Sequence, residues 1–75
     1  MNKLALQIGN NIRYFRKLKG MTQEDLAFAT GCNSNHNNII SPYEVGNRVM
    51  GTTKLKRICD ALDITMEEFF KNINL

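Results

Sequence analysis

The sequence predicts an all-α fold in which five helices form a single domain over residues 1–75. Two long stretches carry apolar residues at helical spacing, and residues that cap helices precede three of the expected helices. A chain of this length buries only a modest share of its surface, which favours the local contacts that helices make. No internal repeat or linker divides the chain, so one domain is expected.

The first helix is predicted from a stripe of apolar residues near the N-terminus. Its members are spaced by four, four, three and three residues: Leu4, Ile8, Ile12, Phe15 and Leu18. Steps of this size return to one face of a helix each time. The pair Lys19 and Gly20 is expected to end the helix.

Thr22 and Asp25 mark the start of a second helix, which is expected over Gln23–Thr30. The threonine hydroxyl can accept from an N–H of the first turn, and Asp25 can reach back as in a capping box. Leu26 begins the buried side of this helix. Gly31 fits the left-handed position that follows a helix.

The third helix is the least defined by the sequence. Four asparagines lie within six residues between Gly31 and Ile40, and asparagine favours turns over helix interiors. Ile40 and Tyr43 share a helical face, yet Pro42 between them lacks an N–H and would clash with the carbonyl of Asn38 in a continuous helix.

Two forms of this helix are compatible with these residues. In the first, a kinked helix runs from about Ser34 to Val45. In the second, the chain breaks at Ser41, which caps a helix that has Pro42 at its first position and Glu44 closing a capping box.

A fourth helix is predicted from about Thr53 to Leu62. Its buried stripe consists of Leu55, Ile58, Cys59 and Leu62. Because Cys59 lies in this stripe, we expect a buried, reduced thiol rather than a disulfide.

Thr65 and Glu68 form another capping-box pattern, which predicts a short fifth helix through Phe69 and Phe70 to about Asn72.

Several features bound the function. No apolar run approaches the ~20 residues of a membrane span, and no secretory signal is evident, so we expect a cytoplasmic protein with no membrane partner. The single histidine, His36, has no acid near it in the sequence, and no phosphate-cradling glycine loop occurs, so no enzyme activity is expected. Cys32 and His36 are too few ligands for a structural zinc site, and we expect no metal, cofactor or small-molecule ligand.

The net charge of +3 is unevenly distributed along the chain. Before Glu24 the chain carries no acid and five bases: Lys3, Arg13, Arg16, Lys17 and Lys19. A second basic group opens the fourth helix at Lys54, Lys56 and Arg57, whereas acids gather later at Asp60, Asp63, Glu67 and Glu68. This division suits a protein that meets phosphate with one surface, although solvated helix faces would give the same pattern.

Two short helices joined by a tight turn are the unit that places a helix in the DNA major groove, so DNA binding is the leading hypothesis. The residues that support it lie in order from Ile8 to Phe70: Ile12-Arg13, Arg16, Gly20 to Gln23, Leu26-Ala27, Gly31, Ile40-Ser41, Tyr43-Glu44, Gly46, Leu55, Ala61-Leu62 and Glu68-Phe69-Phe70. In these residues the chain resembles the DNA-binding domain of lambda repressor and Cro, the XRE-like helix-turn-helix family. The resemblance implies the five-helix lambda-repressor-like fold with a helix-turn-helix.

The resemblance also implies roles for individual residues. Arg16 and Glu44 match a structural ion pair between the first helix and the end of the recognition helix. Contacts to DNA phosphate are implied at the start of the second helix and in the loop after the recognition helix: Thr22, Gln23, Asn47 and Arg48. A helix N-terminus presents N–H groups and a positive dipole end, which agrees with the first of these.

If the third helix enters the major groove, its candidate base readers are Ser34, Asn35, Asn37 and Asn38. Asparagine can form two hydrogen bonds to adenine, worth about 1–3 kcal/mol of discrimination, which favours an operator that contains A·T pairs. The alternative is that these residues only build a solvated turn.

Three features depart from the family pattern. The segment between Gly31 and Ile40 is about three residues longer than is usual in this family. Pro42 stands where the reading helix exposes a polar residue. Phe28 and Thr30 replace a polar and a larger apolar residue, which predicts that the second helix rolls to bury Phe28.

Near the C-terminus the chain has more apolar residues than one face of a short helix can hold: Ile64, Met66, Phe69, Phe70, Ile73 and Leu75. We expect part of this segment to form a homodimer that places two reading helices on successive turns of DNA. The alternative is that the segment covers its own core.

The leading interpretation is a sequence-specific, dimeric transcriptional regulator that binds double-stranded DNA, a repressor of phage, mobile-element or bacterial type. The alternative is a protein-interaction module on the same fold, whose reading helix has degenerated.

Overall fold

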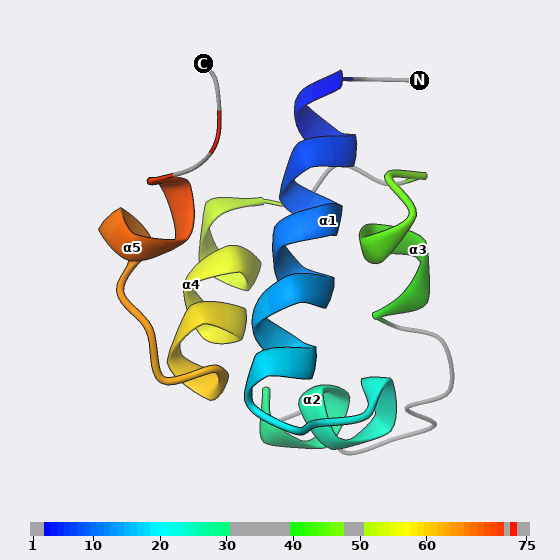
Figure 1. The fold of residues 1–75 in the computed structure, drawn as a ribbon, viewed down its shortest axis with the longest axis vertical. Coiled ribbons are helices and arrows are strands. Elements are labelled where there is room, and N and C mark those ends of the chain that lie inside the picture. The colour runs from blue at the N-terminus through cyan, green and yellow to red at the C-terminus, as the bar shows by residue number, and fades with distance from the viewer. Residues whose placement is uncertain (1–2, 31–39, 48–50, 72, 74–75) are drawn as a thin grey trace.

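A computed structural model describes residues 3–30, 40–47, 51–71 and 73. These residues contain no strand and form five helices (Figure 1): α1 Lys3–Leu18, α2 Gln23–Ala29, α3 Ser41–Glu44, α4 Thr52–Ala61 and α5 Met66–Phe70. This is the five-helix arrangement that the sequence predicts.

The long helix α1 lies at the centre, with α3 on one side of it and α4 and α5 on the other (Figure 1). Two of its residues define these sides. Gly9 packs against the backbone of Tyr43 and Glu44 in α3. On the side of α5, the Asn11 side-chain amide donates a hydrogen bond to the carbonyl oxygen of Phe69 at 2.6 Å. Residues two apart on a helix differ by about 200° in direction, so α3 and α5 contact opposite faces of α1.

The core is built from α1, α2, α4 and α5. Its largest fully buried side chains are Phe69, Ile12, Leu26, Ile58, Leu62 and Cys59. Cys59 is buried and free, as the apolar stripe of α4 predicts. Burial raises the pKa of its thiol from 9.0 to about 11.

The prediction for the buried face of α1 was partly wrong. Leu4 and Leu18 are exposed. Ala5 and Gly9 are buried instead, together with Ile12 and Phe15 of the predicted stripe. The absence of a side chain at Gly9 lets α3 approach closely, and small residues such as Ala5 and Gly9 do not stand out in a pattern of large apolar residues. Phe28 is also exposed, at 71%, so the predicted roll of α2 does not occur.

The capping box of α2 is confirmed. The Thr22 hydroxyl accepts from the N–H of Asp25 at 3.0 Å, and the Asp25 carboxylate accepts from the N–H of Thr22 at 2.9 Å. These hydrogen bonds lower the pKa of Asp25. At α5 the Thr65 hydroxyl accepts from the N–H of Glu68 at 2.9 Å.

The third helix begins at Ser41, with Ile40 rather than Ser41 as its N-cap, and Pro42 is the second residue rather than the first. The predicted cap and capping box are therefore wrong. The Glu44 carboxylate does not turn back to Ser41 because side chains of α1 and α2 bind it. Pro42 is tolerated because its missing N–H falls in the first turn, where no helical acceptor is needed. The start of the kinked alternative, Ser34, lies outside the described residues.

The remaining helix boundaries differ slightly from those expected. α4 begins at Thr52 and ends at Ala61, and α5 ends at Phe70 rather than near Asn72. After α4 the chain turns through Asp63, whose φ of 60° is left-handed. The exact ends of these helices could not be predicted, because the spacing of apolar residues does not define the terminal residues of a helix. No helix in the described ranges is both long and apolar enough to cross a membrane.

Candidate nucleic-acid interface

Three helices meet at a buried network around Glu44. The Arg16 guanidinium donates to both carboxylate oxygens, from Nε to Oε2 at 2.6 Å and from Nη2 to Oε1 at 3.2 Å. The Gln23 side-chain nitrogen Nε2 donates to the same Oε1 at 3.0 Å. Glu44 thus joins the last turn of α1, the first residue of α2 and the last residue of α3.

The network is nearly closed to water. Arg16 is 8% exposed and Glu44 5% exposed. Burial of two charges costs free energy, and several donors to one carboxylate offset that cost. Arg16 also donates from Nη1 to the carbonyl oxygen of Met21 at 2.8 Å, so the same side chain fixes the chain's entry into α2.

The N-terminus of α2 is the part of this junction that can meet phosphate. The first helical hydrogen bond of α2 runs from the N–H of Leu26 to the carbonyl of Thr22. The N–H groups of Gln23 and Glu24 precede it and therefore have no acceptor in the helix. Thr22 is exposed and Gln23 half-buried at this end.

Glu24 and Asp25 lie in the same first turn and oppose the positive end of the helix dipole. Attraction of phosphate to this helix end therefore depends on neighbouring cations. Lys17 and Lys19, exposed at the end of α1 that leads into α2, supply positive charge.

Asn47 follows α3 on an exposed turn. Its N–H donates to the carbonyl oxygen of Pro42 at 2.9 Å, which closes the C-terminus of α3. Gly46 before it has a φ of 79° and lies against Leu6 of α1, where an added Cβ would be 3.0 Å from the Leu6 Cα. The turn therefore fixes Asn47 three residues after the junction residue Glu44.

One contact of this region was not predicted. The Lys54 ammonium of α4 lies over the Tyr43 ring of α3, 5.3 Å from its centroid. The contact lies within the range of cation–π attraction. The sequence contains both residues, but they are 11 positions apart on different helices, and no local pattern joins them.

The predicted base readers Ser34, Asn35, Asn37 and Asn38 lie outside the described residues. So does the predicted phosphate contact Arg48. Within the described ranges, no three histidine, cysteine or acidic side chains are grouped so that they could hold a metal ion.

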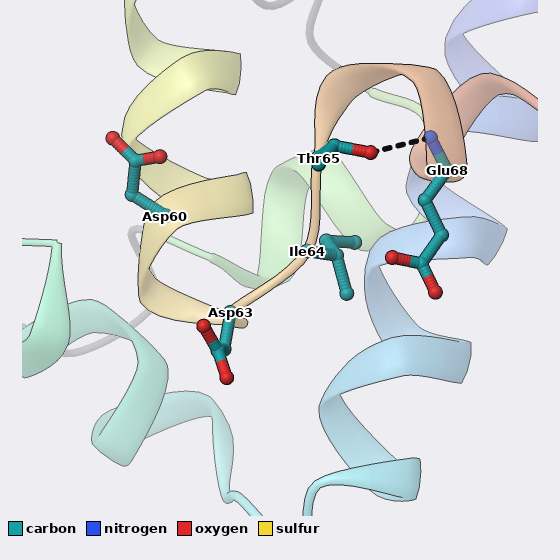
Figure 2. Close-up of a pocket in the computed structure, with 5 residues that line it drawn as sticks. All are labelled: Asp60, Asp63, Ile64, Thr65 and Glu68. Carbon is teal, nitrogen blue, oxygen red and sulfur yellow. Dashed lines mark hydrogen bonds between the residues drawn. The ribbon is translucent and has the colours of Figure 1, made fainter.

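An acidic pocket lies where α4 leads into α5 (Figure 2). It is lined by Asp60, Asp63, Ile64, Thr65 and Glu68. Its carboxylates repel phosphate, and α5 contacts the face of α1 opposite to α3. The acidic side chains therefore gather where α4 ends and α5 begins, whereas the start of α4 is basic and its Lys54 lies over Tyr43 of α3.

The C-terminal apolar segment is divided between core and surface. Ile64, Phe69 and Ile73 are buried in the chain's own core. Met66 and Phe70 are partly buried and pack against that core from outside. Leu75 lies outside the described residues.

Known proteins share both the sequence pattern and the fold. The profile of the helix-turn-helix family matches residues 12–69. The HTH-type transcriptional regulator YazB of Bacillus subtilis strain 168 is 40% identical over 60 residues, which cover 80% of this chain and 83% of YazB. An HTH-type transcriptional regulator of Sinorhizobium medicae strain WSM419 is 30% identical over 71 residues, which cover 95% of this chain and 49% of that relative. The chain therefore spans about half the length of the latter relative.

Solved structures agree with this likeness. The restriction-modification controller protein C.Esp1396I is 30% identical with a TM-score of 0.84, and the match covers 95% of this chain and 90% of that one. Its tetramer has been solved in complex with a natural 35 base-pair operator. The clp gene regulator ClgR from C. glutamicum is 26% identical with a TM-score of 0.83, over 93% of this chain and 86% of that one. The chain belongs to the XRE-like helix-turn-helix family of transcriptional regulators.

Proposed function

We propose that this chain is a sequence-specific repressor that binds a double-stranded DNA operator as a homodimer. The observation that carries the proposal is the junction at Glu44, which fixes the end of α3 against the N-terminus of α2. A rigid relation between a phosphate-binding helix start and a reading helix is what groove recognition requires. The operator complex of C.Esp1396I supports DNA as the partner.

Affinity and specificity come from different residues in this proposal. Contacts to phosphate come from Thr22, Gln23, Asn47 and Arg48. Base edges are read by Ser34, Asn35, Asn37 and Asn38. The asparagines favour adenine, and an A·T-containing operator follows.

The dimer would form through the outer face of the C-terminal segment. Met66 and Phe70 contribute apolar surface there, whereas Phe69 is already fully buried. Two copies joined in this way would place their reading helices about 34 Å apart, on successive turns of one side of DNA. The tetramer of C.Esp1396I on its operator supports the proposal that this chain also binds DNA as an oligomer.

In this role the protein is a regulator of phage, mobile-element or bacterial type that acts in the cytoplasm. Residues 1–75 act as one helix-turn-helix domain, without catalytic activity, cofactor or small-molecule ligand.

Selection from a random pool of DNA duplexes tests DNA reading. The selected duplex is then titrated against a scrambled duplex at about 50 and 200 mM salt. We expect a two-fold-symmetric sequence that binds roughly a thousandfold more tightly than the scrambled duplex. No enrichment, together with weak binding that moderate salt abolishes, would favour the alternative, a protein-interaction module.

Equilibrium sedimentation tests the dimer. We expect a monomer–dimer equilibrium that Phe70→Glu shifts to monomer. Phe28→Glu is the matched control because Phe28 is 71% exposed and lies on α2. Monomer alone at high micromolar concentration of the unmodified chain would contradict the dimer.

A further inference from the structure

The outward face of α5 carries two opposite charges one helical turn apart. Glu67 and Lys71 are both exposed, and residues four apart lie on the same side of a helix. Phe69 points to the opposite side and is fully buried, so the two charges face away from the core. Within the described ranges, neither charge takes part in an ion pair.

A hollow of about 530 Å³ lies on this side of α5. Its lining consists of Thr65, Glu67, Glu68, Phe70 and Lys71, of which Phe70 alone is apolar. The Phe70 ring packs edge-on against the buried Phe69 ring, with 5.3 Å between the ring centroids. The surface therefore has a fixed aromatic residue between charged side chains, which is the arrangement of an apolar interface centre with a charged rim.

A two-fold axis would make this surface complementary to itself. In a symmetric dimer, a residue that contacts a second residue of the partner is matched by the reverse contact. Two antiparallel α5 helices that cross at the level of Phe69 bring Glu67 of each copy opposite the partner's Lys71, since both residues lie two positions from the crossing point. Parallel helices would instead bring Glu67 opposite the partner's Glu67, and like charges disfavour that arrangement.

We infer that Glu67 and Lys71 determine which chain this protein accepts as a partner, namely a second copy of itself with the two α5 helices antiparallel. Phe70 supplies the apolar contact near the axis, and two ion pairs across the axis fix the register. The inference rests on the proposed homodimer and adds its orientation and its choice of partner. The apolar side chains of α5 define neither property, because hydrophobic contact is not directional.

Reversal of one charge is the first test. Glu67→Lys turns both pairs from attraction to repulsion, so we expect the dissociation constant of the dimer, measured by equilibrium sedimentation without DNA, to rise at least about tenfold. Lys71→Glu should have a similar effect. Glu67→Lys combined with Lys71→Glu exchanges the two charges, and it should restore the affinity of the unmodified chain.

Two matched controls separate pairing from general effects of charge. Glu24→Lys makes the same change at the second residue of α2, as Glu67 is the second residue of α5. Lys19→Glu makes the other change at the residue directly after α1, as Lys71 directly follows α5. Neither control should alter the dissociation constant of the dimer. Urea denaturation shows that each variant is folded under the conditions of sedimentation.

A mixture of the two single variants is the second test. The Glu67→Lys copy carries lysine at both positions and the Lys71→Glu copy carries glutamate at both, so only the mixed dimer has attractive pairs. With a mass tag on one variant, native mass spectrometry should show mixed dimers in clear excess over random exchange. The excess should shrink between about 0.1 and 1 M salt, because salt screens exposed charges.

The outcomes are distinguishable. If the unmodified chain and Glu67→Lys dimerise equally well, the inference is overturned while the dimer stands on its apolar contact. Mixed dimers of Glu67→Lys with the unmodified chain that are tighter than dimers of the unmodified chain would indicate parallel helices and would also overturn it. An unmodified chain that stays monomeric at high micromolar concentration would overturn the proposed dimer and this inference with it, whereas selection from random duplexes tests DNA recognition separately.

Discussion

Gly9 of α1 lies directly against the backbone of Glu44 in α3. A Cβ built on Gly9 would be 2.6 Å from the Glu44 carbonyl oxygen and 2.8 Å from its carbonyl carbon. Both obstacles are backbone atoms, which a rotamer change cannot move. The two helices therefore touch at a point where only glycine fits, at the backbone of the residue whose side chain organises the junction.

Gly9→Ala should therefore destabilise the fold although alanine favours helix. Overpacking typically costs roughly 1–3 kcal/mol, whereas the gain in helix propensity is about 1 kcal/mol. We expect a net loss in the free energy of unfolding, measured in urea, and weaker operator binding because α3 is displaced. Asn10→Ala is the control, because Asn10 is exposed on the same helix. This substitution should slightly raise the free energy of unfolding, since alanine favours helix more than asparagine does. A Gly9→Ala variant as stable as the unmodified chain would contradict the close approach.

At Asp63, in contrast to Gly9, replacement by glycine should stabilise the fold. Its φ is 60°, and the turn around it is closed by a hydrogen bond from the N–H of Ile64 to the carbonyl of Cys59 at 3.0 Å. After α1 and α3 the same left-handed position is occupied by Gly20 and Gly46. The backbone of Asp63 is therefore in a conformation that favours glycine.

We expect Asp63→Gly to raise the free energy of unfolding by about 0.5–1 kcal/mol, because relief of the left-handed strain exceeds the entropy that glycine adds to the unfolded chain. Asp63→Ala removes the same carboxylate but keeps a Cβ, so it should show no such gain. Equal effects of the two substitutions in urea denaturation would assign the change to charge rather than to backbone conformation.

The residues above show which parts of this protein a sequence can reveal. Helices α1, α2 and α4 were predicted because their apolar periods and the Thr22 cap are local features of the chain. The contact at Gly9 was not, because a small residue gives no hydrophobic signal and its partner is in another helix. The start of α3 depended on how Pro42 is used, and local sequence allowed two answers.

The candidate site divides in the same way. The pairing of Arg16 with Glu44 was expected from family resemblance, and the structure places the two side chains in contact across 28 positions of sequence. The bond from Gln23 to Glu44 was not expected, since Gln23 was assigned to phosphate alone. Only the packed arrangement of three helices brings those side chains together.

The buried pair at the junction predicts a large effect of Arg16→Met. The substitution leaves the Glu44 carboxylate buried without its cation, which typically costs roughly 3–5 kcal/mol. Urea denaturation should show this loss, and Arg16→Met combined with Glu44→Leu should recover part of it because the uncompensated charge is then removed.

The control is the exposed pair of Lys56 and Asp60, whose side chains are 59% and 62% exposed. Lys56→Met should change the free energy of unfolding by less than about 1 kcal/mol, because water screens the pair. Comparable losses from Arg16→Met and Lys56→Met would contradict a special role for the buried junction.

The thiol of Cys59 predicts a dependence of stability on alkaline pH. Its pKa is raised from 9.0 to about 11 in the folded state. The unfolded chain therefore loses the thiol proton first, and the stability contribution that is complete below 9.0 is lost as the pH rises toward about 11.

In a Cys32→Ser background, unfolding midpoints between these two pH values should fall more steeply than in Cys32→Ser combined with Cys59→Ala. Iodoacetamide should modify Cys59 in urea far faster than under native conditions. Rapid native alkylation would contradict the burial of this thiol.

Arg48 and Asn38 separate the two sources of DNA affinity in the proposed function. Arg48→Ala removes a phosphate contact, so it should weaken binding to every duplex and reduce the salt slope by about one. Asn38→Ala removes a base contact, so it should relax preference at one base step and leave the salt slope unchanged, with a loss on the operator of about 1–3 kcal/mol. Titrations of operator and scrambled DNA at several salt concentrations measure both quantities. If the two variants lost the same affinity on both duplexes, phosphate and base contacts would not be divided between these residues, and specificity would have to arise elsewhere on the surface.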